Sequence, residues 1–168
     1  MTFAYVGPTV CFDLGQVGEL DLLDHLDAAL VVPRSVVEEI TVEPAQINVE
    51  SFLDDQSVIT DVRSRPLDRA ADALGLDPDG YEAALFSGLF DDDADDDILL
   101  VSDDPRLRAI AEGLGAETIG SFGVVVRAAQ ADKYLTRRQA KRIVTRMDAV
   151  GLQMTGSLRG RAVGEFSA

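Results

Sequence analysis

Four carboxylates stand where the sequence predicts that strands end or helices begin. Glu39 lies in the helix expected after a second apolar run, Glu82 opens an otherwise apolar helix, and Asp103 and Asp104 directly follow the apolar run "ILLVS". Taken singly, each has a structural explanation, since an acid near a helix N-terminus can cap it or gain from its dipole. Several acids converging on one edge of a sheet would instead require a cation, because like charges destabilise one another. Oxygen ligands of this kind suit Mg²⁺ or Mn²⁺ and metal-assisted attack of water on a phosphate.

The elements that must position these acids alternate between strand and helix. The patterns predict strands at 3–6, 28–33, 57–63, 98–102 and 116–120, and helices within 7–26, 35–40, 66–75, 77–90, 103–115, 121–135 and 137–151. Such alternation predicts a three-layer α/β/α sandwich with a central, mainly parallel sheet. In such a sheet ligands bind at the carboxyl ends of the strands. We expect strands 3–6 and 98–102 to be neighbours or one strand apart.

Single cysteine and histidine residues exclude several kinds of site. Cys11 rules out an intrachain disulfide and a cysteine-based zinc site, and it falls on the apolar side of a helix, where it is expected to be a buried small hydrophobe. His25 argues against a histidine-rich metal site or a Ser-His-Asp triad, and we expect it to be a surface or capping residue.

The charge is strongly acidic and unevenly distributed. The formal net charge is −15, with a pI near 4.2. This composition is typical of a halophilic protein, because concentrated salt screens the repulsion of an acidic surface. Residues 1–126 hold 27 acids and 6 bases, whereas residues 127–168 hold 3 acids and 9 bases. The overall acidity therefore says little about binding partners. The positive charge of the C-terminal segment, opposite to that of the rest of the chain, is more informative about them.

We expect an α/β core at 1–126 followed by basic C-terminal helices at 127–168 that pack on it, with last residues that could be disordered. A run of bases makes a stripe at i, i+4 spacing: Arg137, Arg138, Lys141, Arg142 and Arg146. Three interpretations stay open for this stripe: pairing with the acidic body, contact with a nucleic-acid backbone, or contact with a partner protein. The sequence shows neither a signal peptide nor an apolar run long enough to span a bilayer, so we expect a cytoplasmic protein without membrane contact.

Several segments together resemble a known family: "GQVGELDLL", "ALVVPRSVVEEI", "DGYEAALFSG", "LLVSDDPRLRAIAEGLGAETIGSFGVVV" and the closing helix pair. In order and spacing they resemble the PIN-domain superfamily, especially short prokaryotic stand-alone proteins related to VapC toxins. The resemblance implies a ribonuclease with four acids around Mg²⁺ or Mn²⁺. Carried over by position, Glu39, Glu82 and Asp104 are the second to fourth acids, with Asp103 as a near alternative.

The first acid of that quartet falls on Gly7, which has no side chain to ligate a metal. Asp13 lies two helical turns away, about 9 Å by helix rise, too far to substitute directly. The sequence therefore favours a catalytically degenerate module that binds RNA or protein. The alternative is a Mg²⁺- or Mn²⁺-dependent ribonuclease of the VapC toxin type, with RNA as substrate and an antitoxin or other protein as partner.

The helix within 77–90 is apolar on nearly all sides, more than one core contact can cover. We therefore expect a homodimer or larger homo-oligomer. A receiver-like signalling domain is disfavoured because the lysines lie only in the C-terminal segment. A dinucleotide-binding enzyme is disfavoured because no G-x-G-x-x-G follows the first strand.

Overall fold

A computed structural model describes residues 1–55, 57–92, 94–130 and 135–151 of the chain. Its described strands form one parallel sheet in the order β2-β1-β3-β4, with β1 at Thr2–Val6, β2 at Ala29–Val31, β3 at Asp97–Val101 and β4 at Glu117–Ile119. The predicted neighbours β1 and β3 pair directly, with Val6 opposite Val101. The suggestion that the last residues could be disordered falls on 152–168, outside the described residues.

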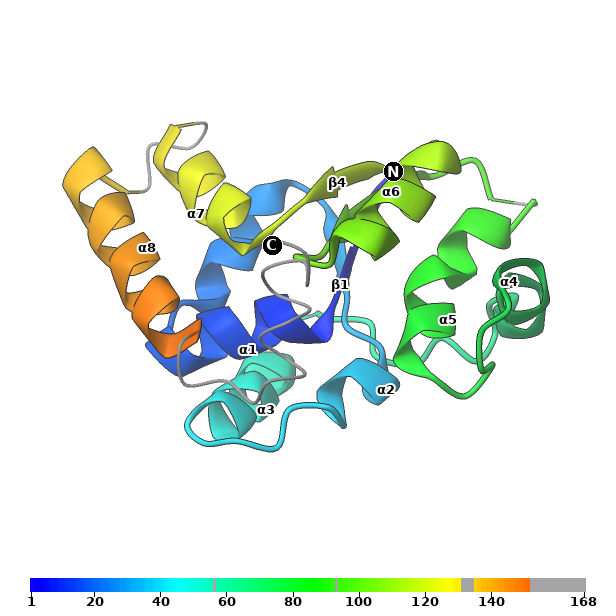
Figure 1. Ribbon diagram of the computed structural model, residues 1–168, viewed down its shortest axis with the longest axis horizontal. Coiled ribbons are helices and arrows are strands. Elements are labelled where there is room, and N and C mark those ends of the chain that lie inside the picture. The colour runs from blue at the N-terminus through cyan, green and yellow to red at the C-terminus, as the bar shows by residue number, and fades with distance from the viewer. Residues whose placement is uncertain (56, 93, 131–134, 152–168) are drawn as a thin grey trace.

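Helices cover both faces of the sheet. Figure 1 shows α1, α7 and α8 on one side of the strands and α4 and α5 on the other. The α-helices are α1 (Pro8–Val17), α2 (Arg34–Val37), α3 (Ala45–Asp55), α4 (Leu67–Leu74), α5 (Tyr81–Phe86), α6 (Pro105–Gly113), α7 (Ser121–Gln130) and α8 (Arg137–Gly151), and the 3₁₀ helices are η1 (Leu20–Leu26) and η2 (Ser87–Phe90). The predicted α/β sandwich is confirmed. No helix in the described ranges is both long and apolar enough to cross a bilayer.

The two central strands are apolar for a physical reason. Ala4, Tyr5 and Val6 of β1 are fully buried, as are Leu100 and Val101 of β3 to within 1%. A strand covered by helices on both faces cannot alternate apolar and polar residues, and it therefore reads as a continuous apolar run. These runs are the part of the fold that the sequence indicates most strongly.

The segments around the sheet edge differ from prediction. Residues 57–63 do not form a strand; they contribute one bridge, between Ile59 and Val31, and the chain then turns where the Arg63 N–H donates to the Asp61 carboxylate. The helix expected over 35–40 ends at Val37. A strand at the edge of a sheet has backbone hydrogen bonds to a neighbour on one side only. A local turn with its own hydrogen bonds can therefore replace the end of such a strand.

Helix α3 was not predicted, and its position depends on Gly15. A Cβ at Gly15 would lie 3.2 Å from the Cα and Cβ of Ala45, so the missing side chain lets α3 approach α1 closely. The Asn48 amide also donates to the Gly15 carbonyl, at 2.8 Å. The sequence of α3 has only a weak apolar face, and its place is fixed by these tertiary contacts.

The apolar helix α5 is covered within the chain. Its buried residues, each at most 9% exposed, are Tyr81, Ala83, Ala84, Leu85 and Phe86. Contacts with α4, α2 and η2 supply the cover. Much of the apolar surface from which we expected a homo-oligomer is therefore covered inside one chain, whereas Leu89 and Phe90 are only partly buried. The homo-oligomer stays a prediction.

Candidate functional site

The carboxyl edge of the sheet gathers the chain segments that the sequence singled out. The Gly7 N–H, just after β1, donates to the Val101 carbonyl at the end of β3, at 2.9 Å. The Ser102 N–H, just after β3, donates to the Ile119 carbonyl at the end of β4, also at 2.9 Å. Gly7, Asp103 and Asp104 therefore lie at one edge of the sheet, as expected for parallel strands.

Gly7 caps α1 in an extended conformation, with φ −83° and ψ 169°. A Cβ built there would lie 3.5 Å from the Val101 carbonyl oxygen, 3.6 Å from a methyl of Leu85 and 3.8 Å from the Ser102 Cβ. These are ordinary van der Waals distances, and a negative φ is open to any residue. Neither the backbone conformation nor the space for a Cβ therefore requires glycine at position 7.

Asp104 is the N-cap of α6. One of its carboxylate oxygens accepts the backbone N–H groups of Arg106, at 2.9 Å, and of Leu107, at 3.3 Å, and Pro105 occupies the first helical position. This is the structural role that the sequence left open for Asp104.

Glu82 forms an ion pair with the side chain of Arg106. The Arg106 guanidinium donates to the Glu82 carboxylate at 2.7 Å, while the backbone N–H of Arg106 is held by Asp104. The hydrogen bond to Glu82, and the nearby acids, raise the pKa of Arg106. Arg106 thus supplies positive charge beside both acids. Sequence reasoning missed this arginine, although its place directly after "SDDP" put it beside the candidate acids.

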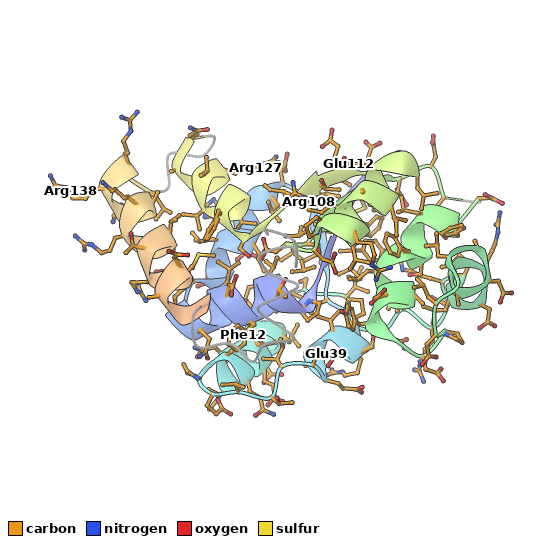
Figure 2. The ribbon with its side chains drawn as sticks, viewed as in Figure 1. Phe12, Glu39, Arg108, Glu112, Arg127 and Arg138 are labelled. Atoms are coloured by element: carbon orange, nitrogen blue, oxygen red, sulfur yellow. The ribbon has the colours of Figure 1, made fainter. Side chains whose placement is uncertain are left out.

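Glu39 stays apart from this arrangement. It is exposed, in the turn that follows α2, and Figure 2 shows it beside that helix. Within the described ranges, no three His, Cys, Asp or Glu side chains are grouped so that they could hold a metal ion. The structure brings Glu82 and Asp104 to one arginine, and it does not gather Glu39, Glu82 and Asp104 into a ligand set.

A different pair of acids meets in the interior. Asp13, from the second turn of α1, and Asp103 both face Ser121, the first residue of α7. The Ser121 N–H donates to Asp103 Oδ1 at 2.7 Å, and the Ser121 hydroxyl donates to Asp103 Oδ2. The same hydroxyl lies 3.2 Å from Asp13 Oδ2. Asp13 is 6% exposed and its Oδ1 has no hydrogen-bond partner in the described structure.

The single proton of the Ser121 hydroxyl can be donated to only one of the two carboxylates. If both acids were ionised, two negative charges would lie close together in the interior, and one of them would lack this hydrogen bond. Burial, together with the like charge of Asp103, raises the pKa of Asp13 to about 8, although the hydrogen bond with Ser121 acts in the other direction. Burial also raises the pKa of Asp103, against the hydrogen bonds from Ser121 and the charge of Arg108. A neutral Asp13 that shares its proton with Ser121 resolves the conflict. We did not predict this cluster, although an acid between the apolar residues Phe12 and Leu14 of an apolar helix could have indicated it.

Asp103, which follows β3, binds the first residue of α7. Both of its oxygens are engaged by Ser121, and a Cβ at Gly120 would lie only 2.6 Å from Asp103 Oδ1. The Arg108 guanidinium is close to the same point and donates to Thr118 at 3.3 Å. Asp103 therefore anchors the N-terminus of α7.

The second candidate region is the basic face of α8. This helix packs on α1 and α7 through Ala140, Ile143 and Met147, and the opposite face carries the exposed bases Arg137, Arg138, Lys141 and Arg142. No ion pair of these four is found in the part of the chain that the structure describes. Figure 2 shows Arg138 projecting from the outer side of α8.

Arg146 has a separate, structural role. It donates to the Val17 carbonyl at the C-terminus of α1, at 2.6 Å, and lies 3.8 Å from Glu19. Beside it a groove of about 410 Å³ is lined by Glu19, Leu135, Gln139, Arg142, Ile143 and Arg146. Pairing with the acidic body, one of the interpretations that the sequence left open, thus applies to Arg146.

Comparison with known families gives the fold a name. Residues 8–167 match a family model described as a PIN domain. The chain belongs to the PIN-domain family. PIN domains are nuclease-like modules that generally use Mg²⁺ or Mn²⁺ and often bind RNA. Searches of curated proteins and of solved structures gave no match.

The acids of this PIN domain do not fit a resident divalent ion. Gly7 has no side chain that could bind a metal. One oxygen of Asp104 accepts the N–H groups at the start of α6, and Glu82 is paired with Arg106. A buried pair, Asp13 and Asp103, is closed around Ser121. The fold is that of a nuclease-like module, and within the described ranges no group of three His, Cys, Asp or Glu side chains could hold a metal ion.

Proposed function

We propose that this PIN domain is a catalytically degenerate module that binds RNA. The observation that carries the proposal is Arg106, whose guanidinium lies 2.7 Å from Glu82 at the same edge where Gly7 replaces an acid. A divalent ion placed beside this arginine would be repelled by a fixed positive charge. It would also lack the carboxylate that Gly7 removes, so the site lacks what metal-assisted hydrolysis requires.

The binding half of the proposal rests on the surface formed by α7 and α8. The described part of this surface, residues 121–130 and 135–151, contains one acid, Asp148, and six bases: Arg127, Arg137, Arg138, Lys141, Arg142 and Arg146. The rest of the chain is strongly acidic. A positive face on such a body orients a polyanion toward one side of the molecule.

RNA is favoured over a protein partner by the spacing of the bases. Arg138, Lys141 and Arg142 lie along one exposed side of a helix, at i, i+3 and i+4. Closely spaced bases of this kind neutralise backbone phosphates and release counterions, and such contacts need no apolar partner surface. Long arginine side chains also reach phosphates through bidentate hydrogen bonds.

The test is binding of a fluorescent single-stranded RNA, followed by anisotropy over a range of KCl concentrations. We expect binding that weakens with salt, and a variant with Arg137, Arg138, Lys141 and Arg142 changed to Gln that binds at least about 10-fold less tightly. Its slope of log K against log salt should fall by roughly 0.7 for each phosphate that the variant no longer neutralises. The matched control changes Arg63 and Arg69, exposed bases outside α7 and α8, to Gln and should bind like wild type.

Cleavage is measured on the same RNA with Mg²⁺ or Mn²⁺ added, and we expect none. Metal-dependent cleavage that Glu82→Gln abolishes would overturn the degenerate assignment in favour of the ribonuclease of VapC toxin type. Failure of RNA to bind at any salt, together with co-purification of an acidic protein released by the four-Gln variant, would replace RNA with a protein partner such as an antitoxin.

A further inference from the structure

Phe122, in the first turn of α7, is an aromatic side chain left in solvent. It is 47% exposed, and Val126, one turn further along the same face, is 42% exposed. The other aromatic side chains in the described ranges are buried or half-buried. An exposed phenyl ring leaves apolar surface in water, so a ligand that covers it is favoured.

The backbone that carries this ring is held firmly. Phe122 directly follows Ser121, whose N–H and hydroxyl are both bound to Asp103 at the end of β3. Ser121 is 1% exposed, and Val124 and Val125 behind it are fully buried. The ring is therefore presented from a fixed helix start at the carboxyl edge of the sheet, so covering it costs little backbone entropy.

The charge around this ring selects the kind of ligand. Helix α7 contains no acid, and the half-buried Arg127 follows Val126. Helix α8, with its exposed bases, packs against α7. Phe122 therefore lies on a helix that carries a base and no acid, and this helix packs against one with four exposed bases. Such a surface is complementary to a ligand that is both aromatic and anionic.

We propose that Phe122, extended by Val126, is a stacking platform for an unpaired base of single-stranded RNA. This inference rests on the proposed function and adds a position for one base to a backbone contact made by α8. A phenyl face accepts any base, since every base presents a π-face. The platform therefore gives affinity for single strands without sequence preference, and a duplex, whose bases are already stacked, cannot use it.

The experiment uses the absence of tryptophan from the chain. Phe122→Trp places one fluorophore on the platform, and single-stranded RNA should quench it, whereas an abasic oligonucleotide of the same charge should not. The matched reporter is Leu114→Trp, an exposed apolar position at the far edge of the sheet beside Thr2 and Asp97, and its emission should not change. Phe122→Ala should weaken binding of single-stranded RNA by about 5- to 100-fold, with Phe122→Tyr close to wild type.

The outcomes separate this inference from the proposed function. If single-stranded RNA binds but neither quenches Phe122→Trp nor discriminates Phe122→Ala from wild type, the stacking platform is wrong and backbone binding stands. If no RNA binds, both fail. If sedimentation shows self-association that Phe122→Ala abolishes, the ring is an interface between copies of this chain, and the base-stacking role is overturned.

Discussion

The Arg106 guanidinium lies 2.7 Å from the Glu82 carboxylate, although 24 residues separate them in the chain. The two side chains are 59% and 28% exposed, so the pair itself contributes little to stability. Its consequence is electrostatic: a positive charge of the protein lies beside the acid that the resemblance to PIN domains assigns to the metal site. The arrangement can be tested by removing the arginine and restoring the missing acid.

Gly7→Asp combined with Arg106→Gln should bind Mn²⁺ at least about 10-fold more tightly than Gly7→Asp alone. Restoring the acid adds a ligand, and removing the guanidinium frees Glu82 from its partner and lifts the repulsion of the ion. Calorimetric titration measures both affinities. Gly7→Asp with Arg69→Gln is the matched control, since Arg69 pairs with Asp92 on another part of the surface. Equal affinities in all three variants would show that Arg106 does not oppose metal.

Asp13→Asn should flatten the pH dependence of the free energy of unfolding. The pKa of Asp13 is about 8 in the folded chain against 3.8 for the free side chain, so between these values the folded state keeps a proton that the unfolded state has released. The contribution of Asp13 to the free energy of unfolding is therefore fully present below about pH 4. It decreases as the pH rises to 8, by up to about 1.4 kcal/mol per pH unit.

Urea unfolding at several pH values between 4 and 8 checks this. Asp72→Asn, at an exposed acid of α4, is the control and should keep the slope of wild type. An Asp13→Asn profile that falls as steeply as that of wild type would mean that Asp13 is charged in the folded chain.

Gly120→Ala should destabilise the protein by about 1–3 kcal/mol, because the new Cβ would lie 2.6 Å from Asp103 Oδ1 and displace the carboxylate from Ser121. Gly113→Ala, at the end of α6, meets no atom within 4 Å and should be neutral or stabilising by up to about 1 kcal/mol. Thermal unfolding compares the two. Equal effects would show that the contact between Asp103 and Ser121 contributes nothing.

Stability should rise as KCl is raised from 0.1 to 1 M, because the Debye length falls from about 10 to 3 Å and screens a net charge of −15. A variant with Glu50→Gln, Asp54→Asn and Asp72→Asn, all at exposed positions, should show a smaller rise. The same rise in both proteins would assign the effect of salt to burial of apolar surface and would remove the support for a halophilic origin.

The sequence by itself determined the layered core. Runs such as 3–6 and 98–102 are apolar because both faces of a central strand are covered, and that periodicity can be read without a structure. It also determined that Gly7 lacks a ligand and that the acid-rich body ends in basic helices. The sequence-based prediction was wrong at residues 57–63, where the chain pairs with the edge of the sheet through one bridge. It also missed α3, whose position depends on tertiary contacts with α1.

Only the tertiary structure decided how the acids are used. Asp13 and Asp103 are 90 positions apart, and both meet Ser121 because α1 and α7 pack on the same face of the sheet. The direction of a long side chain such as Arg106 depends on the helices around it, and no spacing in the sequence encodes that direction. Burial sets the pKa of Asp13 for the same reason, since desolvation is a property of all the atoms that surround a carboxyl group.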